Sequence, residues 1–275
     1  GTDYSYRFAE VWQLEQLASL RTRLLAVDGR DTAFKSLHVQ LLLLQAIARE
    51  YPNTLSWFVE IISRDLALVV GRVRPTAASL AALETVLHAL DRDDRVKRTL
   101  FTYRAETLNN GSPRLALGRP SRVVIPWEAV RRPFDLHRVN EVADMQAQYI
   151  EYADLPWPQR LEPFRDVDFG PFGELNDARA MQRYAAAMSV RQEARNAALV
   201  RSARIAIAIE RARASNATAE IPKLIDPYSG EPMRVKRDDL SYVVYSVGQN
   251  RRDDGGHATL DVTFRPVRAG LSPNP

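Results

Sequence analysis

The sequence predicts a mainly α protein: a multi-helix bundle, followed by a long helix packed on a small three-stranded antiparallel sheet. Up to about residue 215, apolar side chains recur at steps of three and four residues, the spacing of one helix face. After Ser215-Asn216 the pattern changes to short alternating runs between proline, glycine and aspartate, which is typical of strands and tight turns. We therefore expect a helical domain over 1–170 and a second domain over 171–275.

Helices are expected over 5–27, about 32–50, 55–73, 76–90 and 93–108. The segment 66–73 is rich in β-branched residues and could form a strand, but no breaker separates it from the preceding helix, so we favour a helix. The first helix is predicted to be amphipathic. Its apolar residues are Phe8, Val11, Trp12, Leu14, Leu17, Leu20, Leu24 and Leu25.

The middle of the chain is expected to be less regular. Residues 111–134 contain turn signals, and 123–127 could form a short strand or an extended crossing. A helix is predicted over about 135–153, and the proline-rich segment 156–171 is expected to be a connector packed over the core. The longest helix is predicted over 174–215, with a split near Ser189 or Asn196 as the alternative.

Three strands are predicted in the last part of the chain, over 233–237, 242–247 and 260–265. Asp238-Asp239 would form the first turn, and 248–256 a polar loop. This pattern resembles the C-terminal module of the major pseudopilins of type II secretion and of related type IV pilin-like proteins, over about 195–265. The matching residues are Asp226, Pro227, Gly230, Pro232, Tyr242, Tyr245, Ser246, Gly248, Asp254, Gly255 and Gly256.

The resemblance implies a periplasmic or other extracytoplasmic location, with a membrane tether on the full-length protein outside these 275 residues. A pseudopilin has a hydrophobic N-terminal helix with a processing site directly before this module. This chain instead has about 170 mainly helical residues there, which resemble no family known to us. A filament-subunit role is therefore not the leading hypothesis.

The resemblance also implies a calcium ion in the last loop. The candidate ligands are Asn250, Asp253, Asp254 and Asp261, with main-chain carbonyls near Val247 and Gln249; calcium takes six to eight oxygen ligands of these kinds. Arg251 and Arg252 place positive charge in the same loop and oppose cation binding. The alternative is a glycine turn whose aspartates cap main-chain N–H groups and pair with these arginines.

Composition argues against several classes of function. With no cysteine, the chain has no thiol catalysis, disulfide or thiolate metal site. Its net charge is only +4, and the basic cluster over 92–104 is diluted by aspartates, so nucleic-acid binding is not expected. The four histidines, His38, His88, His137 and His257, have no metal-ligand spacing, and no phosphate-loop, dinucleotide or nucleophile-elbow motif is present.

The leading hypothesis is a non-enzymatic, extracytoplasmic scaffold or partner-binding protein with a pseudopilin-like C-terminal module. One alternative is a hydrolase whose groove lies between helices and near Trp127 or Trp157. Trp57 could also line a groove, although core packing is favoured for all three tryptophans. Another alternative is a calcium-stabilised component of a secretion or pilus assembly. The oligomeric state and the partner are not predicted.

Overall fold

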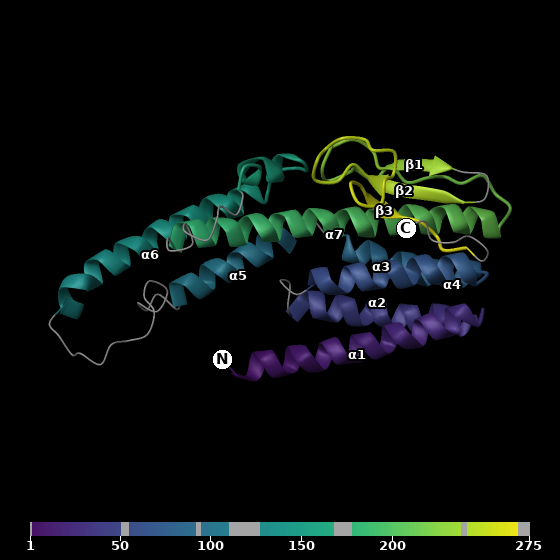
Figure 1. Ribbon diagram of the computed structural model, residues 1–275, viewed down its shortest axis with the longest axis horizontal. Helices are drawn as coiled ribbons and strands as arrows, with labels where there is room; N and C mark the ends of the chain where they lie inside the picture. Colours follow the sequence, from purple (N-terminus) through teal and green to yellow (C-terminus); the bar gives the residue numbers. More distant parts are fainter. Residues whose placement is uncertain are drawn as a thin grey trace. The chain divides into compact units, whose positions relative to one another are not determined.

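The computed structural model describes residues 2–50, 55–91, 95–109, 127–167, 178–237 and 241–268 (Figure 1). The fold is mainly helical with one small antiparallel sheet, which confirms the predicted fold class. The helices are α1 (Thr2–Val27), α2 (Thr32–Glu50), α3 (Leu55–Arg72), α4 (Ala77–Leu90), α5 (Arg95–Asn109), α6 (Trp127–Tyr152), the 3-10 helix η3 (Gln159–Phe164) and α7 (Ala178–Ala214). The strands are β1 (Arg234–Arg237), β2 (Tyr242–Ser246) and β3 (Val262–Phe264).

The chain forms two compact units. The first comprises Gly1–Arg92 and Ala194–Pro275, and the second comprises Asp93–Glu193, so α7 contributes residues to both. The predicted division into a helical domain over 1–170 and a second domain over 171–275 stays a prediction.

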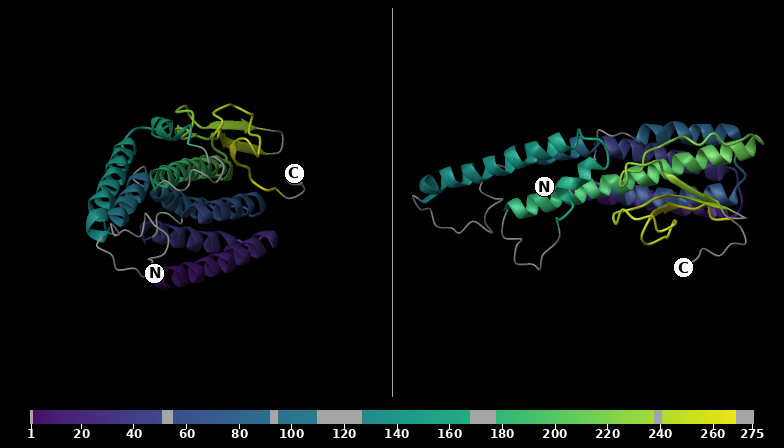
Figure 2. Two further views of the ribbon diagram at one scale, coloured as in Figure 1. Left: turned by 60° about the vertical axis from the view of Figure 1, so that its left-hand side comes forward. Right: turned by 90° about the horizontal axis from the view of Figure 1, so that it is seen from above.

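In the first unit, α1 to α4 form a bundle (Figures 1 and 2). α2 contacts α1, α3 and α4, and α1 packs on α2 and α3. The buried apolar side chains of α2 include Phe34, Leu37, Leu41 and Leu44, at the spacing of one helix face. α3 runs unbroken to Arg72, so the helical interpretation of 66–73 is correct for all but its last residue.

The predicted start of α4 is confirmed by its cap. The Ser79 main-chain N–H donates to Thr76 Oγ1 over 3.1 Å, and the Thr76 N–H donates to Ser79 Oγ over 3.0 Å. This reciprocal pair satisfies two donors that the first helical turn would otherwise leave without partners.

The C-terminal part of α7 lies along the sheet, as predicted (Figure 1). β2 is the central strand, antiparallel to both neighbours, and all its residues are buried. The Tyr242 hydroxyl donates to the Ala206 carbonyl over 3.3 Å and connects β2 to α7. α7 is continuous from Ala178 to Ala214, so the alternative of two helices split near Ser189 or Asn196 is wrong. The predicted strands are confirmed, each slightly shorter than expected.

In the second unit, α5 packs on α6. Lys97 Nζ lies 2.6 Å from a carboxylate oxygen of Asp154. The segment expected to be a connector is described up to residue 167, and the side chains of Leu161 and Phe164 in it are buried. Arg191 donates to the Phe164 carbonyl over 2.8 Å.

One prediction in this region is wrong. The sequence predicts irregular structure over 127–134, but α6 already begins at Trp127. Pro133, a residue type that usually interrupts a helix interior, lies within the second turn of this helix. Residues 123–126 of the possible strand and the Asp238-Asp239 turn lie outside the described residues. None of the described helices is long and apolar enough to cross a bilayer.

Candidate functional site

The C-terminal module is organised around the fully buried carboxylate of Asp226. Its Oδ1 accepts hydrogen bonds from the Tyr228 N–H over 2.9 Å and the Ser246 hydroxyl over 2.6 Å. Its Oδ2 accepts from the Val247 N–H over 3.0 Å and the Ser229 hydroxyl over 3.1 Å. Four donors therefore satisfy the buried charge, as a buried carboxylate requires. Asp226 joins the turn before β1 to the end of β2.

Gly248 explains why the chain can turn tightly after β2. Its φ is +67°, and an added Cβ would lie 2.5 Å from the Leu260 carbonyl oxygen. A side chain at this position would combine backbone strain with a collision against main-chain atoms. The loop over 248–261 therefore depends on glycine here.

The predicted calcium ligands at the start of this loop hydrogen-bond within the loop. Asn250 Nδ2 donates to Asp254 Oδ2 over 2.7 Å, and Asn250 Oδ1 accepts from the Arg252 N–H over 3.0 Å. Asp253 Oδ1 accepts from the Tyr245 hydroxyl and from the Gly255 N–H, each over 3.0 Å.

Asp253 also pairs with a cation from the sheet. Its Oδ2 lies 3.1 Å from Nε of Arg234 on β1. The Gly255 N–H, and then the Tyr245 hydroxyl and Arg234, lower the pKa of Asp253 below its ordinary value. The negative form of Asp253 is therefore stabilised by the protein's own donors.

Asp261 accepts hydrogen bonds from a later part of the loop than these three residues do. Its Oδ2 accepts from the Gly256 N–H over 2.8 Å and the His257 N–H over 2.9 Å. Its Oδ1 is buried and has no hydrogen-bond partner in the described part of the chain. Asp253 and Asp261 both accept main-chain N–H groups, as the glycine-turn interpretation expects. Among the residues that the structure describes, no three Asp, Glu or His side chains converge as a metal-binding group.

The tryptophans proposed to line a groove are only partly described. The side chains of Trp57 and Trp127 lie outside the described residues. The guanidinium carbon of Arg160 lies 4.9 Å from the ring centroid of Trp157, so a cation covers one face of this ring.

The second notable region is α1, which exposes its leucines. The α1 leucine face consists of Leu14, Leu17, Leu20, Leu24 and Val27, each between 55% and 65% exposed. An amphipathic helix normally turns its apolar stripe toward the core. Here Leu14, Leu17, Leu20 and Leu24 of the predicted stripe point away from it, whereas Glu15, Ser19, Thr22 and Ala26 are buried.

Polar contacts hold the inward side of α1. The Thr22 hydroxyl donates to Ser36 Oγ of α2 over 2.8 Å. Arg23 Nε donates to Asp65 Oδ1 of α3 over 2.6 Å, and Gln40 Nε2 of α2 donates to Asp65 Oδ2 over 3.2 Å. The fully buried Asp65 carboxylate thus connects three helices.

Glu15 lies in the same interface. It is fully buried, and neither carboxyl oxygen has a hydrogen-bond partner in the described part of the chain. Burial, reinforced by the negative charge of Asp65, raises the pKa of Glu15 to about 8. Glu15 is therefore mostly protonated at neutral pH, which removes the cost of a second buried charge beside Asp65.

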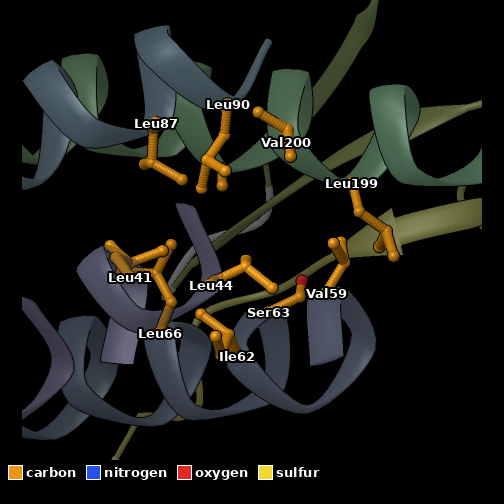
Figure 3. Close-up of a pocket in the computed structure, with 11 residues that line it drawn as sticks. Leu41, Leu44, Val59, Ile62, Ser63, Leu66, Leu87, Leu90, Leu199 and Val200 are labelled. Atoms are coloured by element: carbon orange, nitrogen blue, oxygen red, sulfur yellow. The ribbon is translucent and has the colours of Figure 1, made fainter. Parts of the chain in front are cut away.

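Two hollows lie in the first unit. The α1–α2 groove has a volume of about 400 Å³ and is lined by Leu17, Ala18, Arg21, Thr32, Lys35, Ser36 and Val39. The second hollow is a core cavity of about 20 Å³, around which side chains including Leu44, Leu90 and Val200 gather (Figure 3). Its lining is apolar except for Ser63, so it offers too few polar partners to hold a water molecule well.

Sequence reasoning missed Glu15 and the outward orientation of the α1 leucines. The sequence signal that could have revealed both is the spacing of Glu15, Ser19, Thr22 and Ala26, which places small and polar residues along one helix side.

Comparisons with protein-family models, with curated proteins and with solved structures found no match to this chain.

Proposed function

We propose that this protein is a non-enzymatic, extracytoplasmic scaffold that binds a protein partner, and that a tether holds the full-length protein at a membrane. The α1 leucine face carries the proposal of partner binding. Five large apolar side chains stand exposed along one side of a single helix. Contiguous exposed apolar patches mark interaction surfaces, whereas single exposed leucines do not.

The energetics favour covering this face. Removing the exposed part of one such side chain from water stabilises a complex by about 1 kcal/mol. The α1 leucine face could therefore supply several kcal/mol toward association, from which the entropy cost of binding must be subtracted.

The proposed location rests on the resemblance of the C-terminal module to the major pseudopilins. The module has a long helix packed on a three-stranded sheet, the architecture that the resemblance to major pseudopilins implies. Asp226, Ser246 and Gly248, three of the matching residues, occupy structurally demanding positions. The extracytoplasmic location and the tether follow from this resemblance.

The proposal can be tested in cells of the source organism. A photoactivatable benzoylphenylalanine at position 24 should form a cross-link to another protein, because Leu24 is a 60% exposed member of the α1 leucine face. The same amino acid at exposed Thr85 of α4 is the matched control and should form no such product. Fractionation should find the protein in the cell envelope. Recovery of this protein in the cytosolic fraction would refute the proposed location. Failure of position 24 to cross-link would refute the proposed binding surface.

A second candidate function, a calcium-stabilised component of a secretion or pilus assembly, is favoured by one observation. Asp261 Oδ1 is a buried carboxylate oxygen without a partner among the described residues, and a cation would satisfy it. Asn250, Asp253 and Asp254 lie in the same loop, but they would have to exchange present hydrogen bonds for metal contacts.

Thermal unfolding tests this candidate. A saturating excess of CaCl2 should raise Tm by about 5 °C or more over EDTA, since a ligand that binds only the folded state stabilises it. The gain should disappear in Asp261→Asn and persist in Glu231→Gln, which changes an exposed carboxylate of the same module. Equal Tm values with CaCl2 and EDTA would exclude a stabilising calcium site.

Within the described part of the chain, nothing favours the hydrolase alternative. The core cavity of about 20 Å³ is too small for a substrate, and the lining of the α1–α2 groove contains no Asp, Glu or His. Arg160 covers one face of Trp157, the tryptophan of the proposed groove that is described.

A further inference from the structure

We propose that the α1–α2 groove and the α1 leucine face together bind an amphipathic helix of the partner, whose apolar stripe is flanked by carboxylates. This inference rests on the proposed scaffold function and names the chemistry of the partner that the same surface would take. It follows from the shape of the groove, the length of the apolar face and the charges between them.

The groove is shaped to accept projecting side chains. Leu17 and Val39, which are 65% and 61% exposed, line it together with the less exposed small residues Ala18 and Ser36. Leu17 belongs to both the groove and the leucine face, so the two surfaces are continuous. This arrangement suits the helix-in-groove mode, in which residues at helical spacing insert as anchors.

The length of the face fits several helical turns. From Leu14 to Val27 the exposed residues extend for about 20 Å along α1, at 1.5 Å per residue. A partner helix lying along this distance presents three or four apolar anchors. A short loop or a single inserted side chain would leave most of the face uncovered.

The charges select an acidic partner. Arg21 and Lys35 line the groove, and within the described part of the chain neither lies within 4.0 Å of a carboxylate oxygen. Arg23, also on α1, differs because it is paired with Asp65. Thr32, the first residue of α2, also lines the groove, so the positive end of a helix dipole adds to the potential. Carboxylates beside the partner's apolar stripe would neutralise these charges.

A second copy of the chain and a lipid surface fit this site less well. The residues lining the groove include two cations and no acid, so a two-fold dimer through the same surface would bring like charges together. A bilayer surface could cover the leucines but could not project side chains into a groove between two helices. Both occupants are distinguishable outcomes of the experiment.

The experiment uses the full chain that carries benzoylphenylalanine at position 24. Mass spectrometry should place the cross-link in a partner segment that has apolar residues at helical spacing and acidic residues beside them. Arg21→Glu combined with Lys35→Glu should lower the cross-linking yield at least tenfold. Lys223→Glu combined with Arg237→Glu makes the same charge change at exposed sites elsewhere and should leave the yield within twofold.

A synthetic peptide of the identified segment provides the direct measurement. Fluorescence anisotropy at 0.15 M NaCl should show at least tenfold weaker binding to the Arg21→Glu, Lys35→Glu variant. A peptide with lysine in place of its acidic residues should recover affinity for this variant. That reciprocal rescue requires direct charge pairing, so damage to folding cannot produce it.

Three results would overturn the inference. These are a cross-link to a segment without acidic residues, a cross-link to lipid or to a second copy of this chain, and a yield unaffected by charge reversal. A cross-link to a protein of different chemistry would leave the scaffold function standing and remove only this inference. Failure of position 24 to cross-link at all would remove both.

Discussion

Replacing Glu15 by glutamine should remove a large part of the pH dependence of stability. Burial and the charge of Asp65 raise the pKa of Glu15 from 4.5 to about 8 in the folded protein. Between these values the folded chain holds a proton that the unfolded chain has lost. Folding is therefore favoured at low pH, and this contribution is lost as the pH rises toward 8.

The size of the effect follows from the linkage between protonation and folding. The free energy of unfolding should fall by about 1.4 kcal/mol per pH unit over this window, or by about 5 kcal/mol in all. This is an upper limit, because local opening of α1 can hydrate Glu15 at a smaller cost than global unfolding. Glu15→Gln keeps the shape and cannot ionise, so the variant should match the wild type near pH 5 and exceed its stability by several kcal/mol near pH 9.

Urea denaturation followed by far-UV circular dichroism at pH 5, 6, 7, 8 and 9 provides the measurement. The difference between Glu15→Gln and the wild type should grow between pH 5 and 8 and then level off. Glu10→Gln, which changes an exposed glutamate of the same helix, is the control and should retain the wild-type pH dependence. Parallel stability curves for Glu15→Gln and the wild type would show that Glu15 is not held neutral by its surroundings.

Three further predictions concern buried hydrogen bonds and packing. Asp226→Asn should destabilise the protein by about 3 kcal/mol, because an amide group would face buried donors, whereas Ser229→Ala should cost about 1 kcal/mol; a urea-measured loss below 1 kcal/mol for Asp226→Asn would contradict this role. Gly71→Ala should cost about 2 kcal/mol and speed amide exchange at Val267, because the added Cβ would lie 2.4 Å from the Val267 carbonyl oxygen; unchanged exchange would argue against that contact. Val200→Ile should raise stability by about 0.5–1 kcal/mol by filling the core cavity, and a lower Tm would show that the cavity cannot accept a methylene group.

Helix positions were largely predictable from the sequence, because a helical repeat leaves a periodic pattern whichever side is buried. The same reason explains why the orientation of α1 was not predictable. Its leucines form one stripe, and Glu15, Ser19, Thr22 and Ala26 form another at equally regular spacing. The second stripe is inside because Ser36, Asp65 and Gln40 of neighbouring helices contribute to a polar interface around it. Periodicity along one helix contains no information about these partners.

The C-terminal loop shows a similar limit. The sequence pattern predicts that Asn250, Asp253 and Asp254 lie in one polar loop, and the structure has them in the loop between β2 and β3. Their hydrogen bonds could not be anticipated, since Arg234 reaches Asp253 from β1 and Tyr245 reaches it from β2. The role of Asp226 was visible only as a pattern of turn residues. Its four donors come from Tyr228, Ser229, Ser246 and Val247, which the strand pairing brings together.

The contact between Val267 and α3 bears on how the chain folds as it is synthesised. The Val267 N–H donates to the Ala67 carbonyl over 2.9 Å, and an added Cβ at Gly71 would collide with Val267 main-chain atoms. The two partners are separated by most of the sequence. α3 can form early, but the strip of backbone around Gly71 stays uncovered until residue 267 has been made. Closing a loop of this length is slow compared with local helix formation. Completion of the first unit should therefore wait until residue 267 has been made, and a ribosome-bound chain ending before residue 265 should expose α3 to proteolysis.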